Sequence, residues 1–372
     1  MKSWDAIVIG AGIIGLSLAI ELNKRGLRVL IVEKGEPGRE ASWAAGGMLA
    51  DFLLETPPAL RDLATASARM YSEFVRELED ESSMKIDLRD QGTLLFADVE
   101  TAVRPVLAGP FNSAQGRLRP AATQAYALPR PLAELEPALS TSSPPHFTAL
   151  FVKERCVDPR QLTAAAIGAA RHRGVDFSSG NQVLSVELAA GKAAGVRTSK
   201  TEFAAGIVIN CAGAWAGQIG PDPFPTRPVK GQMLCVVMPQ KELVRHVIRT
   251  HNVYLIPRSD GRLVIGATQE EAGFDKQTIP ETIQKLRQSA LDLVPKLADA
   301  RILEDWAGLR PGTPDGLPIL GATATPGYFV ASGHFRDGIL LAPVTARVMG
   351  QVIAEEAPAH DLKAFAAERF RS

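Results

Sequence analysis

The sequence predicts two structural classes within one chain, an α/β domain and an α+β domain that interrupts it and is built on an antiparallel sheet. Three observations support this. A glycine-rich turn follows the first apolar segment, strand–helix units of the parallel type lie at 1–35, 158–215 and 326–353, and residues 228–268 alternate as antiparallel strands do. We therefore assign residues to the α/β domain over 1–85, 148–226 and 312–372, and to the second domain over 86–147 and 227–311.

The chain begins with a strand, a turn and a helix. Residues 5–9 are an apolar run of strand length, an amphipathic stretch ends at Gly26, and 28–33 is a second strand. The turn has the pattern G-x-G-x-x-G and consists of Gly10, Ala11, Gly12, Ile13, Ile14 and Gly15. In this context the pattern predicts a Rossmann-like dinucleotide site with the pyrophosphate at the helix N-terminus. The alternative is a strand–helix–strand unit whose glycines serve only close packing.

An acidic residue ends the second strand. Glu33 lies where a carboxylate would bond a ribose 2′-hydroxyl, and its charge disfavours a 2′-phosphate. We include the adjacent Lys34 in the predicted nucleotide site.

A segment of small residues follows at 38–48. Its backbone can approach a flat ring system closely, which favours a flavin over a flexible surface loop. The predicted flavin contacts are Ser42, Ala44, Ala45, Gly46, Gly47 and Met48. Only one dinucleotide fingerprint is present, so a bound FAD would be reduced directly by the substrate and not by a nicotinamide.

Further elements follow in order along the chain. Asp158 before Pro159 is typical of a helix N-cap with proline at the first position, and this helix is expected to end at Arg173. Residues 104–147 are expected to be a loop-rich excursion. The other expected elements are helices at 57–80, 280–298 and 339–353 and strands at 92–97, 183–188, 207–210, 231–236, 262–266 and 328–330. A cation and a helix N-terminus after 333–338 would stabilise the anionic edge of a reduced flavin.

Composition narrows the function classes. Lysine plus arginine and aspartate plus glutamate number 41 each, so the net charge of zero lacks the footprint of a nucleic-acid-binding protein. Three distant cysteines without a C-x-x-C pair, and six histidines without ligand spacing, indicate neither a disulfide framework nor a metal site. The apolar residues 6–20 are too short and glycine-rich for a membrane span. These features predict a soluble, cytoplasmic protein.

Several motifs together resemble the D-amino-acid oxidase family of flavoproteins, and within it the glycine oxidase branch. They are the glycine turn with Glu33, the segment 42–48, and the segments 210–215, 254–258, 306–313 and 333–343. The last two are the most specific, and the resemblance covers nearly the whole chain. It implies FAD bound between a Rossmann-like domain and an antiparallel substrate domain.

The resemblance also implies roles for individual residues. Arg310 would hold the substrate carboxylate, Tyr254 would assist it, and Arg336 would lie near flavin and substrate. Without the resemblance, a carboxylate anchor is still the favoured interpretation of Arg310, and an interdomain ion pair is the alternative. Tyr254 alone is more typical of a half-buried core tyrosine, and Arg336 alone could pair with Asp337 or a nearby acid. The remaining predicted cofactor contacts are Val183 (to adenine), Cys211, Ala212, Gly213, Trp215, Arg310, Gly333, His334, Phe335, Arg336, Asp337, Gly338 and Ile339.

Two sequence details refine this. No cysteine lies beyond Cys235, so we expect FAD to be held non-covalently. Gln269 stands where some members of the branch have methionine near the substrate, which leaves the side-chain preference of the pocket open.

The implied activity is oxidation of glycine, sarcosine or small D-amino acids by oxygen, giving glyoxylate, ammonia and hydrogen peroxide in the case of glycine. Coupling to a thiazole synthase in thiamine biosynthesis and a homotetramer follow by analogy. We weigh three alternatives: a dehydrogenase with another electron acceptor, a flavin domain that modifies tRNA, and a nucleotide-binding module without turnover.

Overall fold

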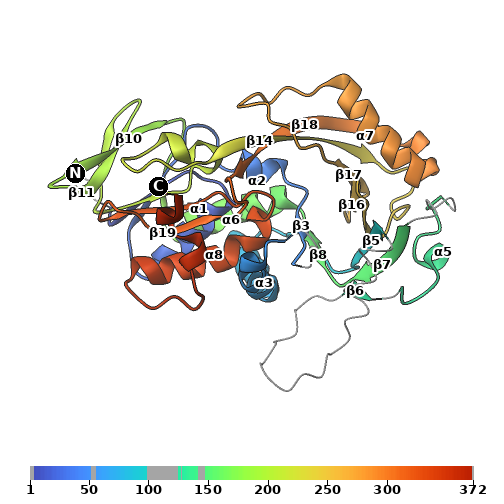
Figure 1. Cartoon of the computed structure of the whole chain (residues 1–372), viewed down its shortest axis with the longest axis horizontal. Coiled ribbons are helices and arrows are strands. Elements are labelled where there is room, and N and C mark those ends of the chain that lie inside the picture. The colour runs from blue at the N-terminus through green and yellow to red at the C-terminus, as the bar shows by residue number, and fades with distance from the viewer. Residues whose placement is uncertain (1–3, 52–55, 99–124, 127, 141–146, 371–372) are drawn as a thin grey trace, which may run out of the picture.

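The computed structural model describes residues 4–51, 56–98, 125–126, 128–140 and 147–370. Figure 1 shows two lobes side by side, with strands β14 (Arg227–Val237) and β18 (Arg301–Gly312) running from one toward the other. Both labelled chain ends lie in the lobe that contains α1 and α8 (Figure 1).

The first lobe is centred on a six-stranded sheet in the order β19-β20-β13-β1-β2-β9. All neighbours are parallel except the edge pair β19–β20. The strands are β1 (Ala6–Ile9), β2 (Val29–Val32), β9 (Asp176–Ser178), β13 (Ile207–Asn210), β19 (Ile319–Ala322) and β20 (Tyr328–Ser332). β1 and β2 are buried at every position, which explains why they are uninterrupted apolar runs.

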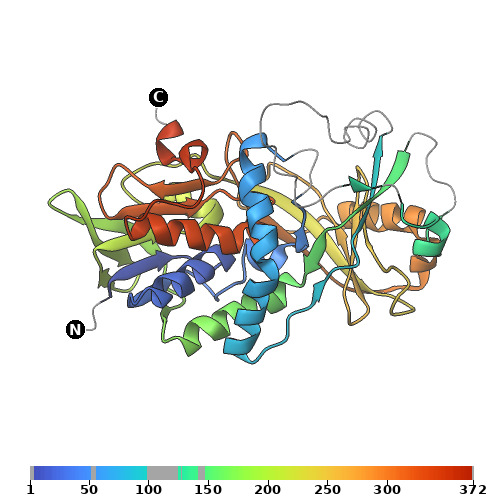
Figure 2. The same ribbon diagram turned by 90° about the horizontal axis from the view of Figure 1, so that it is seen from below.

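Helices cover one face of this sheet and a smaller sheet covers the other. One apolar core joins the sheet to the helices α1 (Ile13–Lys24), α3 (Arg61–Ser82), α6 (Pro159–His172) and α8 (Gly338–Ile353). A second core joins it to β10 (Val183–Ala189), β11 (Lys192–Thr198) and β12 (Glu202–Ala204). Seen from below, α3 crosses the lobe beside the end of α8 (Figure 2).

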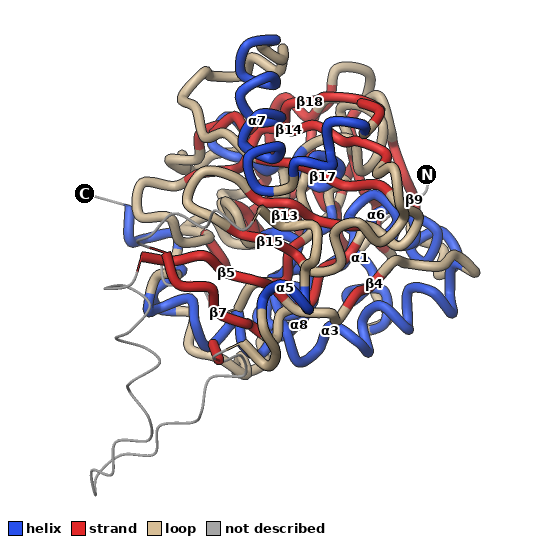
Figure 3. The backbone as a smooth tube through the Cα atoms, turned by 90° about the vertical axis from the view of Figure 1, so that its right-hand side faces the viewer, coloured by secondary structure: helices blue, strands red, loops and turns tan. Residues whose placement is uncertain are grey.

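The second lobe contains an eight-stranded sheet in the order β18-β14-β17-β16-β15-β5-β7-β6. Its shorter strands are β5 (Thr93–Asp98), β6 (Ala125–Tyr126), β7 (Phe147–Val152), β15 (Val247–Arg249), β16 (Tyr254–Pro257) and β17 (Arg262–Gly266). Helix α7 (Pro280–Leu293) packs on one face through an apolar core and lies over β14 and β17 (Figure 3). The opposite face points toward the first lobe.

Short elements complete the described chain. A three-stranded sheet of β3 (Met48–Leu49), β8 (Arg155–Val157) and β4 (Leu88–Arg89) lies between the lobes. The remaining helices are α2 (Ala41–Ala44), α5 (Leu132–Leu135) and the 3₁₀ turns Pro58–Leu60, Gly213–Gln218, Pro295–Asp299, Lys363–Phe365 and Ala367–Phe370. No helix in the described ranges is long and apolar enough to cross a membrane.

The predicted elements differ from the structure at a few positions. The second sheet is not wholly antiparallel, because β15 and β5 pair in parallel. These segments are distant in sequence, so no hairpin forces them to run in opposite directions. The predicted domain boundary at 148 falls inside β7, which pairs with β5 in the second sheet. The predicted helix 280–298 is divided at Val294 into α7 and a 3₁₀ turn. Most of the expected excursion 104–147 lies outside the described residues. The domain ranges themselves stay a prediction.

One local prediction is confirmed in detail. The carboxylate of Asp158 accepts hydrogen bonds from the backbone N–H groups of Arg160, at 2.9 Å, and Gln161, at 3.3 Å. It therefore caps α6 as expected, with Pro159 as the first helical residue.

Candidate active site

A cavity of about 980 Å³ lies between the carboxyl ends of the parallel strands and the inner face of the second sheet. Four predicted segments begin where one of these strands ends: Gly10 after β1, Glu33 after β2, Cys211 after β13 and Gly333 after β20. Ligands of open α/β sheets bind at this edge. The parallel sheet thus gathers motifs that are distant in sequence around one site.

The three glycines of the first turn have different surroundings. Gly10 has φ +104°, and a Cβ on it would lie 2.6 Å from the carbonyl oxygen of Cys211. A Cβ on Gly15 would lie 2.1 Å from the carbonyl oxygen of Gly10. A Cβ on Gly12 would meet only the Ser42 hydroxyl, at 3.2 Å. Gly10 therefore shapes the turn, Gly15 allows the helix to pack against it, and Gly12 leaves open space at the cavity wall.

The N-terminus of α1 opens onto this space. The Ser42 hydroxyl accepts a hydrogen bond of 2.9 Å from the N–H of Ile13, in the first turn of the helix. Ile13 and Ile14 line the cavity, whereas Ala11 and Gly15 do not. The helix end offers N–H donors and a positive dipole end to an anionic group.

Glu33 is held by backbone donors at the end of β2. Its carboxylate accepts hydrogen bonds from the N–H groups of Ala11, at 2.8 Å, and Gly35, at 3.0 Å, and the residue is buried. The neighbouring Lys34 ammonium lies 3.0 Å from the centroid of a Trp215 ring and 3.3 Å from a carboxylate oxygen of Glu40. Burial lowers the pKa of Lys34, opposed by the charge of Glu40.

The other predicted cofactor contacts line the same cavity, with one exception. Gly333 does not line it: this residue has φ +76°, and a Cβ there would lie 2.6 Å from Thr313 Cγ2, so the glycine serves the turn. The predicted residues on the cavity wall include Ser42, Ala44, Ala45, Gly46, Gly47, Met48, Val183, Cys211, Ala212, Gly213, Trp215, His334, Phe335, Arg336, Asp337, Gly338 and Ile339.

Two ionisable residues before α8 have shifted pKa values. Burial lowers the pKa of His334 to about 3, so the ring is neutral at physiological pH, and its Nε2 lies 3.0 Å from the Thr345 hydroxyl. Burial raises the pKa of Asp337 to about 6, opposed by the positive charges of Arg336 and Arg249.

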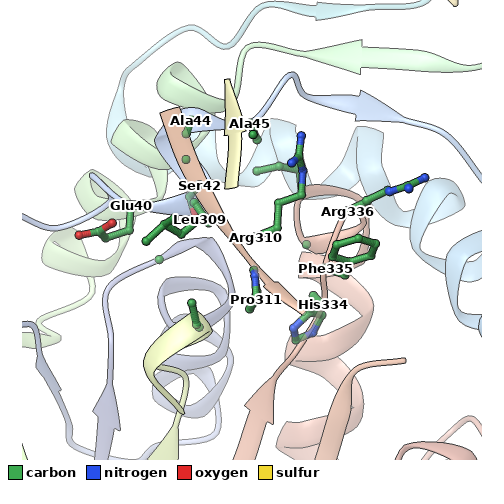
Figure 4. A pocket seen from close by; sticks show the side chains of 18 of the residues that line it. Glu40, Ser42, Ala44, Ala45, Leu309, Arg310, Pro311, His334, Phe335 and Arg336 are labelled. Atoms are coloured by element: carbon green, nitrogen blue, oxygen red, sulfur yellow. The ribbon is translucent and has the colours of Figure 1, made fainter. Parts of the chain in front are cut away.

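Arg310 and Tyr254 meet on the inner face of the second sheet. The guanidinium of Arg310 donates through Nη1 to the carbonyl oxygens of Thr268, at 3.1 Å, and Lys230, at 3.4 Å. It also lies within hydrogen-bonding reach of the Tyr254 hydroxyl, whose pKa burial raises against the arginine charge. Figure 4 shows Arg310 leaving β18, with His334, Phe335 and Arg336 on the neighbouring loop.

Arg336 lies at the same cavity but is exposed. Its Nη2 donates a 2.7 Å hydrogen bond to the side-chain oxygen of Gln269. The alternative partner, Asp337, is affected by the charge of Arg336, which lowers the pKa of its carboxyl group. Arg336 thus acts on Asp337 by its charge and donates a hydrogen bond to Gln269.

A family model described as FAD dependent oxidoreductase, the DAO family, matches residues 5–352. The chain belongs to this family. Glycine oxidase from Pseudomonas aeruginosa is 32% identical over 370 residues, covering 95% of this chain and 96% of that protein. The hydrogen cyanide synthase subunit HcnC of the same species is also 32% identical, covering 100% of this chain and 97% of that subunit.

One further relative is a longer protein, and another has a crystal structure. The bifunctional protein ThiO/ThiG of a Nostoc species is 33% identical over 95% of this chain, but the chain spans only 53% of that protein's length. The crystal structure of glycine oxidase from Geobacillus kaustophilus matches with a TM-score of 0.89 and 30% identity, covering 100% of both chains. This match confirms the predicted combination of a Rossmann-like domain with a sheet-rich second domain.

FAD is the cofactor of this DAO-family protein, and the residues of the cavity fit it. The donors at the start of α1 suit a pyrophosphate, and the space that Gly12 leaves free lies beside them. The buried Glu33 carboxylate lies one strand away, which suits a ribose. The small residues Ala44–Met48 border the part of the cavity that reaches the second sheet.

Sequence reasoning missed several residues of this DAO-family cavity. Met233, Gly231 and Arg249 line it from the second sheet, and Gln182 lines it next to Val183. None belongs to a motif, and the sheet residues face the cavity only because of strand register. No signal in the sequence alone identifies them.

Proposed function

We propose that this protein oxidises glycine, sarcosine and small D-amino acids, with oxygen as the final acceptor. The substrate loses a hydride from Cα and a proton from nitrogen, water hydrolyses the resulting imine, and oxygen is reduced to hydrogen peroxide. For glycine the products are glyoxylate and ammonia. Relatives named glycine oxidase over nearly the full length support this substrate class.

The observation that carries the proposal is the placement of Arg310. Its guanidinium lies in the wall of the cavity, anchored through Nη1 to two backbone carbonyls, beside the Tyr254 hydroxyl. An anchored guanidinium offers its remaining N–H groups in a fixed orientation, which matches the two oxygens of a carboxylate. A carboxylate held here leaves the Cα of a small amino acid inside the cavity.

The contribution of the protein to the reaction is positioning and electrostatics. When bound, FAD supplies the acceptor for the two electrons of the Cα–H bond. Arg310 and Tyr254 fix the substrate carboxylate, and the apolar lining excludes water from the reacting atoms. Burial lowers the pKa of His334 to about 3, which makes the ring too weak a base to take a proton from the substrate, and the ring lies beside Thr345 and shapes the site.

A second candidate keeps the substrate and changes the electron acceptor. The similarity to a hydrogen cyanide synthase subunit, at the same identity as glycine oxidase, favours testing this directly. In that case an amino acid would still reduce the flavin, but electrons would leave to another acceptor. Oxygen consumption in step with substrate loss separates the two candidates.

The names of the longer relatives suggest a cellular role. Proteins named ThiO/ThiG join a segment similar to this chain to a second part of about equal length. We propose that this protein supplies a thiazole synthase with its product, and that it is a cytoplasmic homo-oligomer.

The test is a peroxide assay on the purified yellow holoenzyme with glycine, sarcosine and D-alanine. We expect peroxide and glyoxylate from glycine in equal amounts, and FAD released into solution by acid or heat. Flavin reduction by glycine without oxygen uptake would favour the second candidate. No flavin reduction by any of the three amines would contradict both.

A further inference from the structure

A second arginine lines the substrate end of the cavity. Arg249 is the last residue of β15, and its side chain is 14% exposed, at the cavity wall. The turn residues 250–253 that follow it also line the cavity. Arg249 therefore stands at the inner end of a turn on the cavity wall.

Strand register places Arg249 beside the predicted substrate anchor. Arg249 is directly opposite Tyr254, which is opposite Gly266, which is opposite Met233. Directly opposed residues of neighbouring strands point to the same face of a sheet, and adjacent strands are about 4.8 Å apart. Arg249, Tyr254 and Met233 consequently form one row on the face that lines the cavity.

The gap in this row orients the tyrosine. A Cβ on Gly266 would lie 2.8 Å from Cε2 of Tyr254, so the ring occupies the space over β17, and its hydroxyl donates to Met233 Sδ at 3.6 Å. In the sheet order, the strand of Arg310 is on one side of Tyr254 and that of Arg249 on the other. Both arginines line the cavity that Tyr254 also lines.

The partner of Arg249 occupies only one edge of the guanidinium. Nη1 lies 3.1 Å from Oε2 and 3.4 Å from Oε1 of Glu154, whose side chain is 1% exposed. Within the described part of the chain, Nε and Nη2 of Arg249 make no hydrogen bond to protein. Glu154 therefore holds the arginine in place from behind and leaves N–H donors for a ligand.

Acidic groups lie near Arg249 on two sides. Burial raises the pKa of Glu154, and the nearby charge of Asp51 raises it further. The positive charge of Arg249 lowers it and so opposes both. On the opposite side, Arg249 and Arg336 act on Asp337, at the start of α8. Arg249 thus acts electrostatically on a residue that lines the same cavity.

We propose that Arg249 forms a second anion subsite, and that the substrates include small amines with two carboxylates, one held by Arg310 and the other by Arg249. This inference rests on the proposed function and names a substrate class for it. For iminodiacetate, one Cα–H bond breaks, its two electrons pass by way of the cofactor to oxygen to form hydrogen peroxide, and water hydrolyses the imine to glyoxylate and glycine.

The test compares two substrates that differ by one carboxylate. Iminodiacetate is sarcosine with a carboxylate in place of one N-methyl hydrogen, so the ratio of their kcat/KM values isolates the second subsite. D-Aspartate against D-alanine asks the same question for a carboxylate on the Cα side chain. The variants are Arg249→Gln, Glu154→Gln and the double variant, which removes both charges and so avoids leaving a buried carboxylate unpaired.

We expect the iminodiacetate-to-sarcosine ratio to fall roughly tenfold or more in Arg249→Gln and in the double variant. We expect it to rise in Glu154→Gln, because the arginine keeps its charge and loses its counter-charge. Arg245→Gln is the matched control: it removes an exposed arginine four residues away, outside the cavity, and the ratio should not change. An unchanged ratio in the double variant, or equal losses for both substrates, would overturn the proposal.

A binding measurement separates this inference from the proposed function. Methoxyacetate and diglycolate are analogues of the two substrates with oxygen in place of nitrogen, and cannot be oxidised as amines. Calorimetry on the holoenzyme should give tighter binding of diglycolate, and Arg249→Gln should abolish the difference. If no amine is oxidised but this difference holds, the proposed function and the substrate class fail, and the second anion subsite stands. If sarcosine is oxidised and the difference is absent, only the second subsite fails.

Discussion

The guanidinium of Arg310 lies in the space where Gly231 has no side chain. A Cβ on Gly231 would lie 2.2 Å from Nη1 and 2.5 Å from Cζ of Arg310. The two residues are on neighbouring strands, since Gly231 is opposite Gly308, two residues before Arg310 on β18. The orientation of the predicted carboxylate anchor thus depends on a glycine that belongs to no motif.

Gly231→Ala should therefore impair activity with little effect on folding. The added methyl group displaces the flexible end of an arginine and not the backbone, because the three nearest atoms it would meet are in the Arg310 guanidinium. Displacement by about 1 Å can cost roughly a hundredfold in rate. We expect a ten- to hundredfold loss of kcat/KM for glycine, with FAD content and melting temperature near those of the wild type. Gly206→Ala adds a methyl group where no atom lies within 4 Å and should leave activity unchanged.

Arg310→Ala should reduce kcat/KM for glycine by roughly thirtyfold to several thousandfold. The substrate carboxylate would lose its main partner in a desolvated pocket, which costs about 2–5 kcal/mol, and each 1.4 kcal/mol corresponds to about tenfold. Arg310→Lys should restore part of the loss, because an ammonium cannot reproduce the two-pronged geometry. Steady-state kinetics and flavin absorbance measure both properties.

The control for Arg310 is a primary amine without a carboxylate. The wild type should oxidise it poorly, and Arg310→Ala should not make it much worse. Equal losses for this amine and for glycine, or loss of FAD, would mean that Arg310 joins the lobes structurally. Arg336, which lines the same cavity, would then be the first alternative anchor.

Glu33→Ala should weaken FAD binding about ten- to hundredfold and spare catalysis by the loaded enzyme. A hydrogen bond to a charged group contributes about 1.5–3 kcal/mol, and the carboxylate is at the nucleotide end of the cavity, far from Arg310 in the fold. Titration of apoprotein with FAD gives the affinity. Glu33→Gln should recover only part of the loss, since its amide oxygen can accept from the N–H of Ala11 or of Gly35 but not from both. Unchanged affinity with lost turnover would refute the assignment of Glu33.

Much of the nucleotide end of the site could be predicted because its residues follow one another along the chain. The turn at Gly10, the acid at Glu33 and the cap at Asp158 are local patterns with local causes. Even there, the sequence does not distinguish Gly12, which leaves space in the cavity, from Gly15, which packs the helix. That difference depends on how α1 lies against β1.

The substrate end could be predicted only by resemblance, because its geometry is set across strands. Arg249 and Tyr254 are neighbours through a turn, but Met233 and Arg310 join them through pairings of β14, β17 and β18. A one-residue change of register would turn each side chain to the other face. The parallel pair β15–β5 was missed for the same reason, since it joins segments about 150 residues apart.

Asp337 should make folding stability depend on pH in the direction opposite to an ordinary paired carboxylate. Burial raises its pKa from 3.8 to about 6 in the folded state. Below pH 4 the group is neutral in both states and costs nothing. Between pH 4 and 6 the folded state binds more protons than the unfolded state, so the free energy of unfolding falls as the pH rises, and above pH 6 the full cost remains.

Asp337→Asn should therefore stabilise the protein above pH 6, by at most about 3 kcal/mol, and have little effect at pH 4. Urea unfolding of both proteins from pH 4 to 8, with flavin content measured in each, tests this. Asp315→Asn is a control of opposite sign: burial acts to raise the pKa of Asp315, but hydrogen bonds from Arg369 and the N–H of Leu317 lower it, so losing its charge should destabilise the protein. His334 acts with the opposite sign: burial lowers its pKa from 6.5 to about 3, so between these pH values the unfolded state binds more protons and the free energy of unfolding rises with pH. Both proteins contain His334, so the difference between them isolates Asp337. A difference in the free energy of unfolding between the two proteins that does not grow from pH 4 to 6 would show that Asp337 does not carry this dependence.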